Sequence, residues 1–144
     1  MDLQYVRTRP DAVDPVCASS GAAGVDLAVP EAVTVPARGT AVVDLGLAVE
    51  VPDGHVGLLL PRSSLGFLYG ITLANTVGVI DSDYRGPLLV KLQNNTMSPV
   101  EFGTGYRIVQ LMIVPIVAAD TWQQVDELPP TMRGAGGIGS TGTH

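Results

Sequence analysis

Residues 40–61 read TAVVDLGLAVEVPDGHVGLLLP, and this stretch indicates the class of the fold. Val and Leu dominate both halves of it, and β-branched residues such as Val favour strands. The triplet Pro52-Asp53-Gly54 separates the halves and has the residue types that tight turns need. We therefore expect one strand over residues 40–51 and a second over residues 55–60, joined by a turn.

The same pattern recurs on both sides of this stretch and predicts further strands over residues 24–29, 88–93 and 107–114. The 17 Gly and 11 Pro are spread throughout the chain. Long helices are excluded, because an interior Gly or Pro costs a helix about 1 or 3 kcal/mol. Residues 63–69 are the one plausible short helix. The sequence predicts an all-β, jelly-roll-like β-sandwich with little helix.

Composition limits the size and the partners of the protein. At 144 residues and 46% hydrophobic content, we expect one domain with its own core. The net charge of -6 argues against nucleic acid as a partner, because phosphate-backbone binding needs clustered Lys and Arg. No run of 18 apolar residues occurs, and Asp2, Arg7 and Arg9 replace an apolar signal region. We expect a soluble, cytoplasmic protein that does not bind membranes.

The C-terminal tail differs from the rest of the chain. Residues 131–142 read TMRGAGGIGSTG and contain almost nothing that can be buried. Such a segment is mobile when alone, and a Gly-rich tail is more often a frayed terminus than a functional element. We expect a β domain over residues 1–128 and a flexible C-terminal arm over residues 129–144.

The segment LPRSSLG, residues 60–66, is a candidate anion site. An apolar strand ends at Pro61 and delivers Arg62, Ser63, Ser64 and several backbone N–H groups to one place. An equally good explanation is that a serine caps a helix while Arg62 is merely solvated.

The segment NTVGVIDSDYRG, residues 75–86, is interpreted as a β-hairpin with a polar tip. Asp81 follows Val79 and Ile80, so we expect partial shielding from water, which suits a carboxylate that deprotonates water. The alternative is an ordinary turn aspartate. Tyr84 has a flat apolar face, and Asn75 has the donor and acceptor needed to read a pyrimidine edge.

Two further segments place polar residues in apolar strands: GYRIVQL at residues 105–111 and AGVDL at residues 23–27. Such residues need partners. A buried ion pair explains Arg107 at least as well as a ligand contact, and Gln110 is the better candidate for a phosphate donor. Asp26 is either a satisfied core aspartate or an acid that orients magnesium-bound water.

These segments, together with RGAGGIGSTG at residues 133–142, resemble in order the five motifs of the trimeric dUTPase family. The resemblance runs from Ala23 to Gly142. It implies a jelly-roll (β-clip) subunit in a homotrimer whose active sites draw on neighbouring chains. It also implies Mg²⁺-dependent hydrolysis of dUTP to dUMP and pyrophosphate, which limits uracil incorporation into DNA and supplies dUMP for dTMP synthesis.

The resemblance also assigns roles to individual residues. Asp81 would be the general base that activates the water attacking the α-phosphorus. Asp26 would contact magnesium-bound water, while the triphosphate itself holds the metal. The arm would close over the nucleotide, on a neighbouring subunit. The remaining substrate-binding residues would be Arg62, Ser63, Ser64, Asn75, Val79, Ile80, Tyr84, Leu89, Gln110, Arg133, Ile138, Gly139, Ser140 and Thr141.

One position departs from the family pattern. The family usually has an aromatic residue where this chain has Ile138, and that ring stacks on uracil. Base stacking contributes roughly 1–3 kcal/mol, so we expect weakened closure of the arm rather than loss of activity. Two other functions are considered on the same scaffold: a nucleotide-binding regulatory protein and a dCTP deaminase. Pyrophosphate release from dUTP but not from dCTP would separate them.

Overall fold

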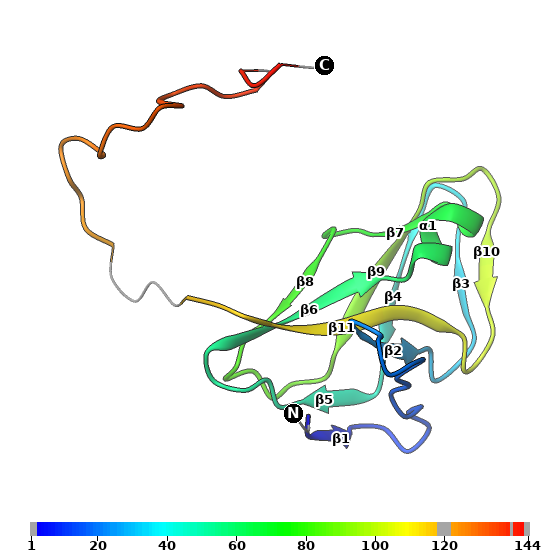
Figure 1. Ribbon diagram of the computed structural model, residues 1–144. Helices are drawn as coiled ribbons and strands as arrows, with labels where there is room; N and C mark the ends of the chain where they lie inside the picture. Colours follow the sequence, from blue (N-terminus) through cyan, green and yellow to red (C-terminus); the bar gives the residue numbers. More distant parts are fainter. Residues whose placement is uncertain (1–2, 118–121, 139, 143–144) are drawn as a thin grey trace.

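The computed structural model describes residues 3–117, 122–138 and 140–142. These residues form mostly strands and contain one short helix (Figure 1). The elements are β1 (Tyr5–Arg7), β2 (Val25–Ala28), β3 (Val33–Val35), β4 (Thr40–Asp44), β5 (Leu47–Val49), β6 (His55–Pro61), α1 (Ser63–Tyr69), β7 (Ile71–Leu73), β8 (Gly78–Ile80), β9 (Leu89–Asn94), β10 (Val100–Phe102) and β11 (Arg107–Pro115).

All strand pairings are antiparallel, as expected for a jelly-roll-like sandwich. One sheet has the order β2-β11-β6-β8 and a second has the order β4-β9-β7. Two small sheets pair β1 with β5 and β10 with β3. The predicted all-β class is confirmed.

Strand β11 joins the segments that matter for function. It pairs with β2 on one side and with β6 on the other, where its register runs from Val109 opposite Pro61 to Pro115 opposite His55. Arg107 and Gln110 belong to β11, and Arg62 directly follows β6. Three segments that are distant in sequence therefore meet at one end of β11.

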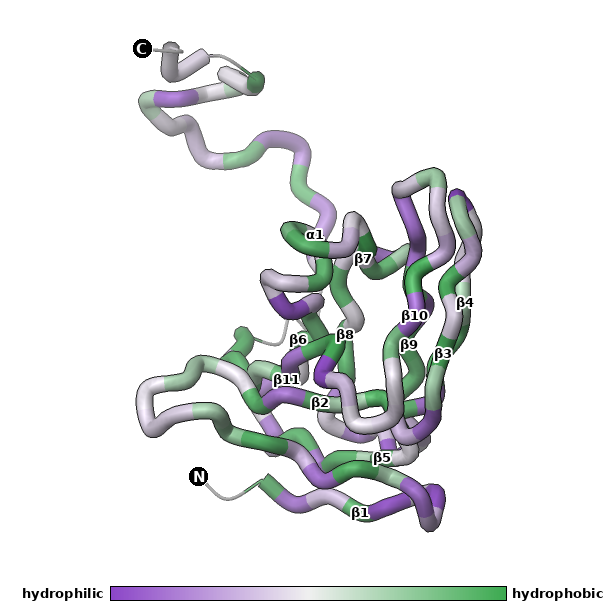
Figure 2. The backbone as a smooth tube through the Cα atoms, turned by 90° about the vertical axis from the view of Figure 1, so that its right-hand side faces the viewer, coloured by the Kyte–Doolittle hydropathy of each residue, from purple (hydrophilic) through white to green (hydrophobic). Residues whose placement is uncertain are grey.

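The core lies between the sheets. Its largest fully buried side chains include Phe102, Leu27, Leu59 and Leu92. Burial alternates strictly along β9, as expected for a strand with one face toward the core. Figure 2 shows apolar residues recurring along the strands of the body, with polar residues at several turns.

The predicted strand over residues 40–51 is in fact two strands, β4 and β5, which belong to different sheets. The extended conformation is interrupted at Gly46, whose φ of 71° lies in the left-handed region that glycine tolerates best. The Gly46 N–H donates to the Asp44 carboxylate at 2.8 Å. This N–H therefore bonds a side chain instead of the backbone of a neighbouring strand.

The predicted helix over residues 63–69 is confirmed. It ends at Gly70, which has a φ of 63° and donates its N–H to the Gly66 carbonyl at 3.1 Å. The helix begins after Arg62 without any side-chain capping bond. The idea that Ser63 or Ser64 caps this helix is therefore wrong, and neither hydroxyl is used in that way.

Beyond β11, the described residues form no further helix or strand. In Figure 1 the chain extends away from the β body toward the C-terminus. Trp122, Leu128, Met132 and Ile138 are all largely exposed. The division into a domain over 1–128 and an arm over 129–144 stays a prediction. No helix of the described residues is long and apolar enough to cross a membrane.

Candidate active site

Five predicted substrate-binding residues line one cavity of about 250 Å³, together with Asp81. Strand β8 and the start of β9 form its walls. Its lining consists of Asn75, Gly78, Val79, Ile80, Asp81, Tyr84, Pro87 and Leu89. We call this cavity the nucleoside pocket. It brings Asp81 together with Asn75, Val79, Ile80, Tyr84 and Leu89.

The pocket exists because the expected hairpin does not form. Strand β8 pairs with β6, whereas β9 pairs with β4 and β7 in the other sheet. The two arms around Asp81 therefore separate instead of pairing, which leaves space between them. Strand β8 is the last strand of its sheet. Its outer edge presents backbone N–H and C=O groups that have no ladder partner among the described residues, and such groups can bind a ligand.

The turn after β8 holds Tyr84 in place. The Tyr84 N–H donates to the Asp81 carbonyl at 3.1 Å, and the Tyr84 hydroxyl donates to the Pro87 carbonyl at 3.0 Å. A Cβ at position 86 would lie 2.6 Å from the Tyr84 Cζ, so only glycine fits beneath the ring. The ring is 41% exposed and forms part of the pocket wall.

Asp81 itself is exposed at the pocket. The expectation that neighbouring residues of its own chain shield it is therefore wrong, because Ile80 turns toward the core while Val79 faces outward. Shielding has to come from a bound molecule or another chain. Asn75 already uses its amide nitrogen to bond the Val77 carbonyl at 3.2 Å. Its side-chain oxygen forms no hydrogen bond among the described residues.

A second group of predicted residues surrounds Asp26. The Asp26 Oδ2 atom lies 3.1 Å from Arg62 Nε and 3.1 Å from an Arg107 guanidinium nitrogen. The carboxylate is only 10% exposed, so it is a buried aspartate held by two ion pairs. The ion-pair explanation of Arg107 is confirmed. Two guanidinium groups around one carboxylate leave a net positive charge at this place.

Gln110, Ser63 and Ser64 belong to the same group of predicted residues. Gln110 lies opposite Asp26 in the β2–β11 register, and its Nε2 donates to the Pro61 carbonyl at 3.3 Å. Ser63 is exposed and Ser64 is half-buried in the first turn of α1. We use "basic cluster" below for Asp26, Arg62, Ser63, Ser64, Arg107 and Gln110.

An aromatic contact that the sequence did not predict supports the basic cluster. The Tyr106 hydroxyl donates to the Tyr69 hydroxyl at 2.8 Å, and both rings pack against the buried Phe102. This hydrogen bond and partial burial raise the pKa of Tyr106. Tyr69 ends α1 and Tyr106 precedes Arg107, so the contact ties the helix to β11. The only signal in the sequence is an aromatic residue beside each motif.

Asp81 and the basic cluster lie toward opposite ends of β6. Ile80 pairs with Gly57 near the start of β6, and Arg62 follows its last residue, Pro61. Asp81 comes after Ile80, so about six strand residues, or roughly 20 Å, separate it from Arg62 along the strand. One chain therefore does not bring these two residues together.

The described arm residues form hydrogen bonds only with one another. Arg133 donates through its Nε to the Gly136 carbonyl at 2.9 Å, and Ser140 N–H donates to the Gly137 carbonyl at 3.1 Å. Ile138, Ser140 and Thr141 are exposed, and none of them lines the nucleoside pocket. Gly139 lies outside the described residues.

Known proteins resemble this chain along nearly its whole length. The dUTPase family model matches residues 11–142. The chain belongs to the dUTPase family. This family member is 43% identical to the deoxyuridine 5'-triphosphate nucleotidohydrolase of Paraburkholderia phytofirmans over 147 aligned positions, which cover 100% of this chain and 99% of the relative.

Solved structures of the dUTPase family share its fold. The Staphylococcus bacteriophage 80alpha dUTPase with dUPNHPP superposes with a TM-score of 0.91 at 27% identity, covering 98% of each chain. A mutant dUTPase from phage phi11 of S. aureus, described with a structural Mg(II) ion, gives a TM-score of 0.80 at 26% identity. That comparison covers 88% of this chain and 98% of the phage protein.

Proposed function

We propose that this dUTPase family member hydrolyses dUTP to dUMP and pyrophosphate by attack of water on the α-phosphorus. The observation that carries this proposal is the nucleoside pocket, in which Asp81 lies beside an open strand edge and the ring of Tyr84. Family membership supports the same reaction.

The pocket offers the groups needed to select a deoxyuridine. The free edge of β8 supplies backbone N–H and C=O groups that can pair with the edge of uracil. Tyr84 would pack against the deoxyribose and leave no space for a 2′-hydroxyl. Because Gly86 and Pro87 hold this ring, the exclusion of ribonucleotides would be steric.

Asp81 would act as the general base. Its carboxylate takes a proton from a water molecule, which forms a bond to the α-phosphorus while the bond to the bridging oxygen breaks and pyrophosphate leaves. No covalent intermediate is needed, so positioning and charge stabilisation supply most of the rate enhancement. Binding of the nucleotide would also cover Asp81, which is exposed in the free chain.

The basic cluster would bind the phosphates. Its net positive charge, the two serine hydroxyls and the Gln110 amide suit the anionic oxygens of a triphosphate. Arg133, Ser140 and Thr141 of the arm would reach the terminal phosphates, and Ile138 and Gly139 would cover the base. The glycines of the arm allow its backbone to approach phosphate closely.

The donor set of the described residues fits magnesium as an ion held by the substrate. The described residues contain no group of three or more metal-ligating side chains. Both guanidiniums contact Asp26 Oδ2, and Oδ1 forms no hydrogen bond among the described residues. Oδ1 could therefore accept a hydrogen bond from magnesium-bound water. When bound, Mg²⁺ would neutralise charge on the phosphate oxygens.

We further propose that the active protein is a homotrimer. The roughly 20 Å between Asp81 and Arg62 along β6 supports this, because a second chain could place its basic cluster beside Asp81 of the first. Closure by the arm of a neighbouring chain is part of the same proposal. A cytoplasmic location and a role in limiting uracil in DNA also remain predictions.

Pyrophosphate release over a panel of dUTP, dTTP, dCTP and UTP tests the reaction. Wild type should turn over dUTP and leave dCTP untouched. Asp81→Asn should lower kcat by roughly 10²- to 10⁴-fold while dUPNHPP still binds. An unaffected rate would remove Asp81 as the base. Release of ammonia from dCTP would favour the deaminase, and binding without turnover by wild type would favour the regulatory protein.

Mixing two inactive variants tests the trimer. Asp81→Asn lacks the proposed general base, and Arg62→Ala lacks one arginine of the proposed phosphate-binding cluster. If sites form between chains, refolding the two together should restore part of the activity, since some sites then receive both intact halves. No recovery in a mixture shown to exchange chains would contradict the shared site.

A further inference from the structure

Arg85 is an exposed arginine directly after the turn that contains Asp81 and Tyr84. Its guanidinium folds back on its own turn. One terminal nitrogen donates to the Ser82 carbonyl at 2.6 Å and to the Tyr84 carbonyl at 3.0 Å. The guanidinium therefore links two backbone carbonyls of the turn.

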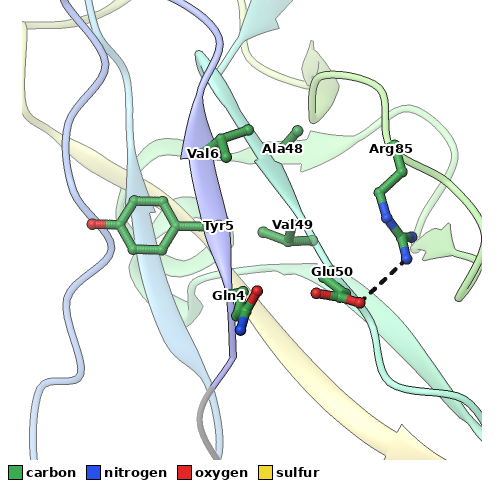
Figure 3. Close-up of a pocket in the computed structure, with 7 residues that line it drawn as sticks. All are labelled: Gln4, Tyr5, Val6, Ala48, Val49, Glu50 and Arg85. Atoms are coloured by element: carbon green, nitrogen blue, oxygen red, sulfur yellow. Dashed lines mark ion pairs between the residues drawn. The ribbon is translucent and has the colours of Figure 1, made fainter.

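The same guanidinium also ties the turn to the body of the protein. Its other terminal nitrogen lies 3.5 Å from Glu50 Oε1 (Figure 3). Glu50 directly follows β5, whose three residues are all buried, and its N–H donates to the Gln4 carbonyl at 2.9 Å. The turn is thereby connected through one side chain to a strand that belongs to the core.

Arg85 lines a different cavity from the nucleoside pocket. It lines a separate cavity of about 240 Å³ between β1, β5 and the turn, together with Gln4, Val49 and Glu50. Figure 3 shows Arg85 and Glu50 pointing toward each other across this cavity, while Tyr5 points away. Arg85 does not line the nucleoside pocket, so it is not placed to touch a nucleotide there.

We propose that Arg85 is a positioning residue that fixes the direction of the Asp81 carboxylate, with Glu50 as its anchor. This inference rests on the proposed function. The two partners are 55% and 53% exposed, and exposed ion pairs contribute only about 0–1 kcal/mol to folding. Misplacing a reacting group by about 1 Å can nevertheless lower a rate about a hundredfold. Loss of Arg85 should therefore lower the turnover rate far more than it lowers the stability of the fold.

Four variants test this inference: Arg85→Met, Arg85→Lys, Glu50→Gln and the control Arg7→Met. The control removes an ion pair of similar exposure, Arg7–Asp14, that does not touch the turn. For each variant we would measure kcat, the Kd of dUPNHPP and the melting temperature. Arg85→Met should lower kcat roughly tenfold to a hundredfold, with little change in Kd or melting temperature.

The remaining variants separate positioning from a structural role. Arg85→Lys should recover part of kcat, because an ammonium can still bond a carbonyl but lacks the guanidinium fork. Glu50→Gln should give a smaller loss, and Arg7→Met none. Equal losses of kcat and dUPNHPP binding would make Arg85 a ligand contact. An unchanged kcat in Arg85→Met would overturn the inference.

Hydrogen exchange gives a readout that does not need activity. The Tyr84 amide is bonded to the Asp81 carbonyl within the turn. It should exchange faster in Arg85→Met than in wild type or Arg7→Met, and equal protection would overturn the inference. A wild type that releases no pyrophosphate from dUTP would refute the proposed function, whereas exchange would still decide whether Arg85 holds the turn.

Discussion

Asp26 and Arg107 form an ion pair of 3.1 Å between the neighbouring strands β2 and β11. Arg62 shares the same carboxylate oxygen at the same distance. One negative charge is thus surrounded by two positive ones. Without Arg107, the carboxylate would cancel the charge of Arg62 and weaken the attraction for phosphates. In the proposed site, Arg107 would therefore support phosphate binding without touching a phosphate.

Loss of Arg107 should be reversed in part by loss of Asp26. Arg107→Met should weaken dUPNHPP binding by about 1–2 kcal/mol, or roughly fivefold to thirtyfold, because the cluster then has no net charge. Asp26→Asn in the same chain should recover part of this affinity by freeing Arg62. Calorimetric titration of the single and double variants measures the coupling. Strictly additive losses would contradict this account, and Arg9→Met is the control.

Restoring an aromatic residue in the arm should tighten closure. Stacking on a base contributes roughly 1–3 kcal/mol, and Ile138 already supplies part of the apolar cover, so Ile138→Phe should lower KM severalfold. Steady-state kinetics with dUTP measures this. Ile138→Leu is the control, since leucine has the same number of atoms as isoleucine and has no aromatic ring. If both kinetic parameters stay unchanged in Ile138→Phe, the arm does not cap the base.

Gly86 should control the choice of sugar. A Cβ at this position would collide with the Tyr84 ring, so Gly86→Ala should displace the ring and open space for a 2′-hydroxyl. The ratio of kcat/KM for dUTP and UTP should fall about tenfold or more. Gly103→Ala is the control, because a Cβ there meets no atom within 4 Å. An unchanged ratio in Gly86→Ala would show that Tyr84 does not exclude ribose.

The N-terminal segment should contribute an acid-sensitive part of the stability. Hydrogen bonds from Arg7, and then from Tyr5, lower the pKa of Asp14 in the folded chain. A lowered pKa stabilises the fold above the ordinary carboxyl pKa, and this contribution disappears as the pH falls through the folded value. Asp14→Asn should therefore lower the melting temperature at neutral pH, and the difference should shrink as the pH falls below about 4.

Thermal melts of both chains from acid to neutral pH measure this difference. Glu101→Gln is the control, because Glu101 forms no ion pair among the described residues. A difference between wild type and Asp14→Asn that stays constant over the whole range would rule out the Asp14 ionisation as its source.

The longer strands could be predicted because they repeat a pattern over several residues. Strands β6, β9 and β11 lie within two residues of their predicted bounds. The short strands β1, β3, β7 and β10 were not predicted, because three residues give at most one alternation. The break at Gly46 depends on a left-handed φ and a bond to Asp44, which residue types alone do not reveal.

The site was predictable where its residues are close in sequence. The residues around Asp81 line one pocket because they flank a single turn. The pairing of Arg62 and Arg107 with one carboxylate depends on which strands are neighbours, and the hydroxyl bond between Tyr69 and Tyr106 does too. The role of Arg85 needed its side-chain direction, which no local pattern encodes.

The placement of Asp81 and Arg62 at opposite ends of β6 has a genetic consequence. In the proposed trimer, each chain lends its carboxylate to one site and its arginines to another. A chain in which both residues are substituted would then inactivate two sites of the trimer instead of one. In a cell that expresses an intact and a damaged gene copy, mixed assemblies would form and the damage would behave as dominant.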